Sequence, residues 1–187
     1  MSRNAAETEG KILDLAESLI RKNGYNGVSF RDLASGVGVK SSSVHYYFPT
    51  KEDLGAKVAR RYTDRFLNAL GDPEDGPATA SEIMKKLQDL FVSALGSDGQ
   101  MCLCGILAAE SAGLPESVVS EAKSFFDRVS EWMTVSLSRT EWAQNRLEEE
   151  IKAQALSALA LLEGGMIIAR VQNDPALLTT LRPQLAR

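Results

Sequence analysis

The stretch SFRDLASGVGVKSSSVHYYFPTKEDL, residues 29–54, decides the fold that the sequence predicts. Ser29 followed by Asp32 is a helix-start pattern close to the capping box, in which two side chains satisfy free N–H groups of the first turn. Gly38 supplies a turn, because glycine enters the left-handed region without a Cβ penalty. The stretch therefore predicts two short helices joined at Gly38, a helix-turn-helix.

The apolar positions predict how these two helices pack. Leu33 and Ala34 face inward, and Ala34 is small enough to let a second helix cross closely. Val39, Val44 and Phe48 then bury the second helix against the first. Alanine, glycine and valine at 34, 38 and 44 have the spacing that the geometry of the motif requires.

The outward positions carry small donors, aromatic rings with polar tips, and cations, which can reach base edges and phosphates without steric intrusion. A plain αα-hairpin would explain the apolar positions but not these. Tyr47 and Lys51 are expected at phosphates, and Lys40, Ser42 and Ser43 nearer to base edges. The predicted DNA-binding residues are Ser29, Arg31, Lys40, Ser41, Ser42, Ser43, His45, Tyr46, Tyr47 and Lys51.

The segment HYYFPTKEDL, residues 45–54, resembles the tyrosine-rich end of the recognition helix and the Phe-x-x-Lys-Glu-x-Leu junction of the TetR/AcrR family of bacterial transcriptional repressors. The specific match covers about residues 9–60. Lys40 stands where the family often has a Ser or Thr cap, and His45 where it usually has a phosphate-contacting tyrosine. The resemblance leaves the contact made by position 45 open.

The resemblance implies a repressor that leaves a palindromic operator when a small-molecule effector binds among the helices of its body. It does not name the effector, the operator or the regulated genes. Residues of these types are more often plain core than ligand contacts. The candidates are Phe66, Phe91, Cys102, Leu103, Leu107, Phe126, Trp132 and Met166.

Composition predicts an all-α protein. The 187 residues are 44% hydrophobic, include only 6 prolines, and lack β-branched runs flanked by turn signals. We expect a three-helix head with the helix-turn-helix in residues 1–50, and a larger helical body for ligand binding and dimerisation in residues 51–187, about nine helices in all. Lys and Arg outnumber Asp and Glu by 11 to 8 in residues 1–65, whereas acids prevail by 17 to 10 in residues 66–187. This asymmetry fits a DNA-facing head on an acidic body.

Periodicity and break signals place the remaining helices. Gly71–Pro77 and residues 97–100 are expected as breaks. The expected helices outside the motif are 7–22, one starting near 51, 80–95, a short one within 101–113, 115–138, 148–173 and 175–185.

The expected helix 148–173 is apolar nearly all round between Ala155 and Val171, so it has a second apolar stripe beyond the one that its own core needs. Small residues at Ala158, Gly164 and Gly165 would let a partner helix approach. A central core helix in a monomer is the competing interpretation. A short reading helix favours a homodimer through the last two helices, with recognition helices about 34–36 Å apart or somewhat more on an inverted repeat.

The sequence gives little support for an enzyme. His45 is the only histidine, and it lies on the expected recognition helix. No His, Cys and Asp cluster has metal-ligand spacing, and no Gly-rich phosphate loop is present. We therefore expect neither an enzyme nor a metal or cofactor site.

Cys102 and Cys104 are the only cysteines, too few for a disulfide framework and compatible with a reducing cytoplasm. The MCLCGILAAE stretch also resembles a subgroup in which a cysteine near this helix start senses electrophiles. Cys102, expected in the first helical turn, would be the more reactive thiol. The favoured interpretation of both cysteines is small hydrophobic residues in a core, with electrophile sensing as the alternative.

Two further expectations concern location and partners. The first ten residues have no apolar signal segment, and the apolar stretch 155–169 is broken by Ser157, Glu163 and the Gly164–Gly165 pair, so neither a signal peptide nor a membrane span is expected. A cytoplasmic DNA-binding protein is the favoured interpretation. A helical interaction dimer whose helix-turn-helix no longer binds DNA is the alternative.

Overall fold

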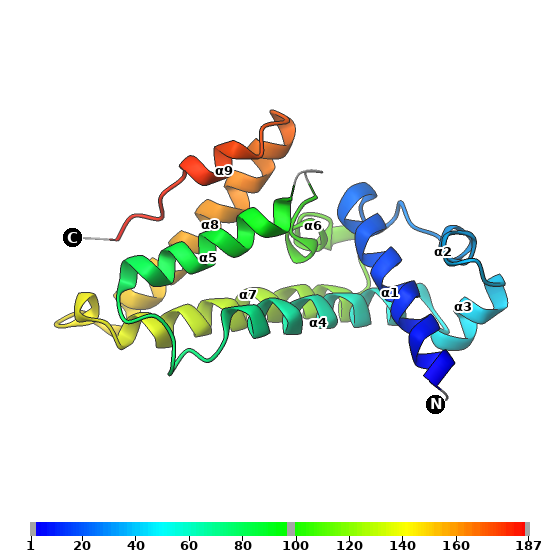
Figure 1. Ribbon diagram of the computed structural model, residues 1–187, viewed down its shortest axis with the longest axis horizontal. Coiled ribbons are helices and arrows are strands. Elements are labelled where there is room, and N and C mark those ends of the chain that lie inside the picture. The colour runs from blue at the N-terminus through cyan, green and yellow to red at the C-terminus, as the bar shows by residue number, and fades with distance from the viewer. Residues whose placement is uncertain (1–2, 97–99, 186–187) are drawn as a thin grey trace. The chain divides into compact units, whose positions relative to one another are not determined.

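The computed structural model describes residues 3–96 and 100–185, and within them the chain forms nine α-helices, two 3₁₀ turns and no strand (Figure 1). The all-α prediction is confirmed, and the predicted break at 97–100 lies mostly outside the described residues. The elements are α1 (Arg3–Asn23), α2 (Phe30–Val37), α3 (Ser41–Tyr47), α4 (Lys51–Leu70), α5 (Ala80–Leu95), α6 (Leu103–Ala109), η1 (Ser111–Gly113), α7 (Glu116–Ser138), η2 (Glu141–Ala143), α8 (Glu148–Val171) and α9 (Ala176–Thr180).

The chain divides into two compact units. The first holds the chain up to Thr63 together with Leu103–Lys123, and the second holds Asp64–Cys102 together with the chain from Ser124 on. The divisions fall within α4, directly before α6 and within α7. The predicted border at residue 50 does not coincide with any of them and stays a prediction about function.

In the first unit, α2 begins and ends as its sequence predicts. Ser29 accepts a hydrogen bond from the Asp32 backbone N–H, and the Asp32 carboxylate accepts one from the Ser29 N–H, which completes a capping box. Gly38 ends the helix at φ +77°, in the left-handed region. Leu33, Ala34, Val44 and Phe48 are buried, whereas Val39 is only half-buried.

Helix α1 is longer than predicted, since it begins at Arg3 rather than near residue 7. Ala5 and Ala6 extend it, because alanine has the highest helix propensity and does not need an apolar stripe to continue a helix. It ends as predicted at Gly24, whose φ is +79°. Ile12, Ala16 and Ile20 bury its inner face.

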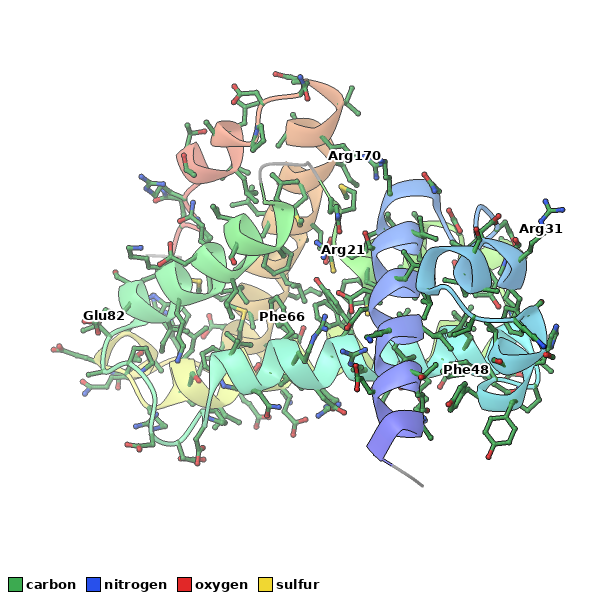
Figure 2. All side chains as sticks on the ribbon, turned by 45° about the vertical axis from the view of Figure 1, so that its right-hand side comes forward. Arg21, Arg31, Phe48, Phe66, Glu82 and Arg170 are labelled. Atoms are coloured by element: carbon green, nitrogen blue, oxygen red, sulfur yellow. The ribbon has the colours of Figure 1, made fainter. Side chains whose placement is uncertain are left out.

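The core of the second unit is built around an aromatic cluster. The Phe66 ring lies edge-on to Phe91 and Phe125, with centroids 5.6 and 5.1 Å apart. Each of these rings comes from a different helix, so the cluster joins α4, α5 and α7. Helix α5 starts at a second capping box, formed by Thr79 and Glu82 (Figure 2).

The end of the chain corrects the predicted ninth helix, which stops at Thr180 instead of 185. Pro183 explains the early stop, because it disfavours helical backbone at the residue before it and lacks an N–H. The extended segment lies back on the second unit, where Gln88 Nε2 donates to the Leu181 carbonyl at 2.5 Å and Gln154 Nε2 to the Gln184 carbonyl at 2.7 Å.

The region 101–113 is also corrected. Helix α6 starts only at Leu103 and ends at Ala109, and the last part of the predicted helix is the 3₁₀ turn Ser111–Gly113. Cys102 therefore precedes the helix rather than lying in its first turn.

Candidate nucleic-acid interface

The candidate interface is the outward side of α2, α3 and the start of α4. Helices α2 and α3 pack against each other through Ala34 and Val44, which are both buried. This packing leaves the opposite side of α3 to solvent. The sequence folds this way because its apolar residues recur on one side of two short helices joined by a left-handed glycine.

Most of the predicted contact residues lie on that outward side. Tyr46 is 78% exposed. The His45 ring is exposed and lies edge-on to Phe30 of α2, with centroids 4.7 Å apart. Arg31 extends from α2 into solvent (Figure 2). The other exposed members of the predicted set are Ser29, Lys40, Ser41 and Ser42.

Some predicted contact residues have partners within the protein. The Ser29 hydroxyl donates to the Asp32 carboxylate at 2.6 Å, so it is occupied by the capping box. Ser43 and Tyr47 are half-buried, and the Tyr47 ring lies 5.2 Å from that of Tyr46 in an edge-on arrangement. The hydrogen-bonding groups most open to a ligand are therefore in the first turn of α3 and on Tyr46.

Lys51, the first residue of α4, rests on an aromatic ring that sequence reasoning missed. Its Nζ lies 4.5 Å from the centroid of the Tyr25 ring, within the range of a cation–π contact. Burial lowers the pKa of Lys51, and the Glu110 carboxylate offsets part of this effect. Burial, and then Glu52, raise the pKa of Tyr25. This contact could not be predicted from the sequence, because no residue next to Tyr25 signals a contact with Lys51.

The start of α4 contains a capping box that the sequence signalled and the prediction omitted. Thr50 N–H and Oγ1 both donate to the Asp53 carboxylate, at 3.1 and 2.7 Å, and the Asp53 N–H donates back to Thr50 Oγ1. Thr-x-x-Asp before an apolar run is the recognisable pattern. It fixes where α4 begins, and hence where Lys51 stands relative to α3.

The predicted effector-pocket residues are in two places. Leu103 and Leu107 belong to the first unit, and the others belong to the second. All are buried except Phe126, which is half-buried and stacked edge-on against Phe125. The remaining residues in the second unit are Phe66, Phe91, Cys102, Trp132 and Met166.

Two described cavities of the second unit lie along α5 instead. The first, about 770 Å³, lies between α5 and the chain's final segment and is lined by Gln88, Thr179 and Arg182 among others. The second, about 720 Å³, is lined by the loop residues Pro77 and Ala78 and by one side of α5. None of the predicted pocket residues borders either cavity.

The outer side of α8 is apolar and exposed. Ile167 is 54%, Ile168 55% and Val171 81% exposed, and Leu156 and Leu161 lie on the same side at helical spacing. We call these five residues together with Gly164 the α8 outer face. A Cβ added at Gly164 would meet no atom within 4 Å, whereas one at Gly165 would lie 2.2 Å from Leu181 of the same chain.

This distinction corrects the predicted use of the small residues. Gly165 and the buried Ala158 serve packing within the chain, and only Gly164 opens outward. By length and composition alone α8 could also cross a membrane, and 44% of its most apolar window is buried inside the protein.

Both thiols are buried, Cys102 at 1% and Cys104 at 0% exposure. Cys104 Sγ lies 4.0 Å from the Thr63 hydroxyl within the first unit. Within residues 3–96 and 100–185, no group of three His, Cys, Asp or Glu side chains is placed to hold a metal ion.

Comparison with known proteins matches both parts of the chain to regulators. Residues 12–58 match the model for bacterial regulatory proteins of the tetR family, and residues 77–184 match the C-terminal domain of LmrA/YxaF-like transcriptional regulators. The repressor KstR2 of Mycobacterium tuberculosis is 29% identical over 85 residues, 46% of this chain. The match spans only 41% of the length of KstR2.

Solved structures match over nearly the whole chain. A TetR regulator from Legionella pneumophila is 35% identical, with a TM-score of 0.83 over 91% of this chain and 90% of that one. A TetR family regulator from Agrobacterium tumefaciens is 30% identical, with a TM-score of 0.86 over 96% and 95% of the two chains. These proteins are transcriptional regulators, which agrees with the prediction that the chain is not an enzyme.

Proposed function

Because the chain belongs to the TetR family of bacterial transcriptional regulators, we propose that it is a homodimeric repressor released from a palindromic operator by a small-molecule effector. The family makes it a DNA-binding regulator. The proposal adds the sign of regulation, the dimer surface, the DNA-contacting residues and the release mechanism.

One observation carries the DNA-binding part of the proposal, namely the exposed polar side of α3. Its first turn presents the Ser41 and Ser42 hydroxyls and the Lys40 ammonium to solvent, and hydroxyl and ammonium groups at the start of a reading helix are suited to base edges and phosphates. Tyr46, further along, adds a ring with a polar tip. Lys51 at the start of α4 is assigned to a phosphate, where a cation and a helix N-terminus both favour an anion.

The α8 outer face supports the choice of partner, which we take to be a second copy of this chain. Four apolar side chains of this face are exposed, namely Leu156, Ile167, Ile168 and Val171. Their removal from water is favourable when another apolar surface covers them. An isologous dimer brings the same face of the second copy to it. Twofold symmetry then matches an inverted-repeat operator with reading helices about 34–36 Å apart or somewhat more. Within the predicted pairing through α8 and α9, we assign the larger part to α8, because Leu178 of α9 packs inward near Gly165 of the same chain.

The effector is assigned to the second unit. The predicted residues Phe66 and Phe91 are packed against each other, so an effector among them must displace an aromatic ring. The cavity between α5 and the final segment is an open alternative place. Release requires that the effector binds the DNA-free arrangement more tightly, by about 1–3 kcal/mol for a typical coupling.

Location and alternatives follow from the same features. We place the protein in the cytoplasm, where its DNA is, and assign the apolar outer face of α8 to a protein partner rather than to lipid. The electrophile-sensing alternative is less well supported than effector binding, because both thiols are buried and Cys102 precedes α6. The non-DNA-binding dimer remains the alternative that the following experiment separates.

A gel-shift with the promoter region next to the protein's own gene tests the proposal. We expect a shifted band with the wild-type protein, and its loss with Lys40→Glu/Ser42→Glu, which places two acids on the exposed start of α3. Lys85→Glu, an exposed change on α5, is the matched control and should shift like the wild type. A wild-type protein that shifts neither this fragment nor any duplex from a random pool would favour the interaction dimer.

A further inference from the structure

Glu110, which lies 85 positions after Tyr25 in the sequence, contacts the residue that supports Lys51 at the DNA interface. Glu110 follows α6 directly, and its Oε2 accepts a hydrogen bond of 2.9 Å from the Tyr25 backbone N–H. Tyr25 in turn carries the Lys51 ammonium on its ring, with Nζ 4.5 Å from the ring centroid. The end of α1, the end of α6 and the start of α4, all in the first unit, therefore meet at one residue, Tyr25.

The local sequence is shaped to admit this carboxylate. A Cβ added at Gly24 would lie 2.1 Å from Glu110 Oε1, so only glycine leaves room for the side chain at the end of α1. The φ of Gly24, +79°, independently favours glycine there. The end of α1 thus turns and at the same time receives an acid from a distant segment.

Tyr25 itself is held on its other side. A Cβ at Gly55 of α4 would lie 2.6 Å from Tyr25 Cε2, so the ring lies directly on the α4 backbone. The residue is only 4% exposed. Because the ring is enclosed by α4 and its backbone is held by Glu110, a displacement of Glu110 moves the surface on which Lys51 rests.

The position is electrostatically unusual for an acid. A carboxylate at the C-terminal end of a helix is disfavoured by the helix dipole, and a lysine at a helix N-terminus such as that of α4 is disfavoured as well. Each offsets the other, since the Glu110 charge acts on Lys51 and favours its protonated form.

We propose that Glu110 is a positioning residue of the DNA interface, which holds Tyr25 beneath Lys51 and so sets the phosphate contact of Lys51. The inference rests on the proposed function, because it requires that Lys51 binds DNA. It also gives the segment Leu103–Lys123 a role, since both ends of this segment lead into the second unit. A change that begins in the second unit can then reach Lys51 through Glu110.

A double-mutant cycle tests the inference. Anisotropy titrations use a fluorescein-labelled operator duplex that the wild-type protein selects from a random pool, at several salt concentrations. We expect Lys51→Ala to weaken binding about tenfold and to lower the salt slope by about one. Glu110→Ala should weaken it about threefold to fivefold, and the double variant should bind no more weakly than Lys51→Ala alone.

Two comparisons separate positioning from general damage. Glu110→Gln keeps an acceptor for the Tyr25 N–H and should bind within about twofold of the wild type. Glu116→Ala removes an exposed acid from the start of α7, in the same unit, and should leave affinity and slope unchanged. Should Glu110→Ala not fold, as judged by circular dichroism, Glu110→Asp withdraws the carboxylate by one methylene and takes its place in the cycle.

The outcomes distinguish this inference from the proposed function. Losses from Glu110→Ala and Lys51→Ala that multiply in the double variant would overturn the coupling while leaving the DNA contact of Lys51 in place. Lys51→Ala without effect on affinity and slope would overturn the docking itself, and the role of Glu110 with it.

Discussion

Helices α3 and α8 both leave one side uncovered, and the two sides differ in chemistry. The outward side of α3 presents hydroxyls, an imidazole and a phenol, with Tyr46 78% exposed. The α8 outer face presents Ile167, Ile168 and Val171, each more than half exposed. Neither side is needed by the core of its own unit, since each helix buries its opposite stripe.

The difference indicates two different partners. Exposed hydrogen-bonding groups are already solvated, so burial alone does not stabilise a complex through them. They suit a charged, hydrated partner such as DNA, because hydrogen bonds of defined direction can recognise it. Burial of exposed isoleucine and leucine side chains is favourable whatever the orientation of the partner's groups, because the hydrophobic effect is not directional. One chain therefore combines a directional surface for reading DNA with a non-directional surface for pairing.

The largest effect is expected from placing a charge on the α8 outer face. Ile168→Glu should weaken self-association by at least about 100-fold, roughly 3 kcal/mol, because an unpaired acid would be buried at the dimer contact. Sedimentation equilibrium measures the change. Lys85→Glu, an exposed charge reversal on α5 instead of α8, is the control. Equal association by both variants would break the comparison, since α8 would then have no apolar partner.

The second prediction concerns Glu163, the acid on the apolar part of α8. Burial raises its pKa to about 7, the Cys102 thiol offsets only part of the rise, and its Oε1 is buried without a hydrogen-bond partner. A raised folded-state pKa means that the stabilisation is complete below the unfolded value of 4.5 and is lost as the pH rises to about 7. Glu163→Gln should therefore raise the free energy of unfolding by about 2–3 kcal/mol more at pH 8 than at pH 5.

Urea unfolding at the two pH values and at one protein concentration gives this difference. Glu149→Gln, an exposed acid in the first turn of the same helix, is the control and should show no such pH dependence. A Glu163→Gln curve parallel to the wild type across this range would mean that the apolar part of α8 is hydrated.

The third prediction sharpens the α3 side by separating phosphate from base contacts. Lys51→Ala should weaken binding to every sequence by about tenfold, roughly 1.4 kcal/mol, and lower the salt slope by about one. Ser42→Ala should leave the slope and change the preferred base at one operator position. Titrations and random-pool selection measure the two effects. The same change in salt slope and base preference in both variants would contradict the assignment of Lys51 to a phosphate and Ser42 to a base.

The smallest effect is expected from the cysteines. Since Cys102 and Cys104 are buried, iodoacetamide should label neither in the native protein within the time that labels both in urea. The double change to serine should leave operator affinity within about twofold. Rapid native labelling accompanied by loss of DNA binding would instead support thiol-based sensing.

The sequence predicted those features whose causes are local. The Ser29–Asp32 cap, the left-handed Gly38 and the apolar spacing of α2 and α3 each involve residues a few positions apart, and all of them are present in the structure. The predicted helix ends were less accurate where helix propensity or a proline determines the end, as at Ala5 in α1 and Pro183 after α9.

Contacts between distant segments were not predictable. The Glu110–Tyr25 hydrogen bond joins residues 85 positions apart, and neither residue has a neighbour whose type signals the other. The roles of Gly164 and Gly165 also could not be told apart from sequence, because only the return of the final segment assigns one of them to Leu181. Periodicity identified two apolar stripes on α8 but not which residues the chain itself would cover.

Hydroxyl-radical footprinting on the selected operator, with the protein-to-DNA stoichiometry measured by sedimentation, tests most directly whether α8 pairs two copies so that two α3 helices read one site. We expect two protected half-sites related by a twofold axis, with centres about 34–36 Å apart or somewhat more and two chains per duplex. Ile168→Glu should lose both half-sites together at concentrations where the wild type fills them. A single unsymmetrical half-site occupied by one chain, equally well by Ile168→Glu and the wild type, would contradict the proposed dimer.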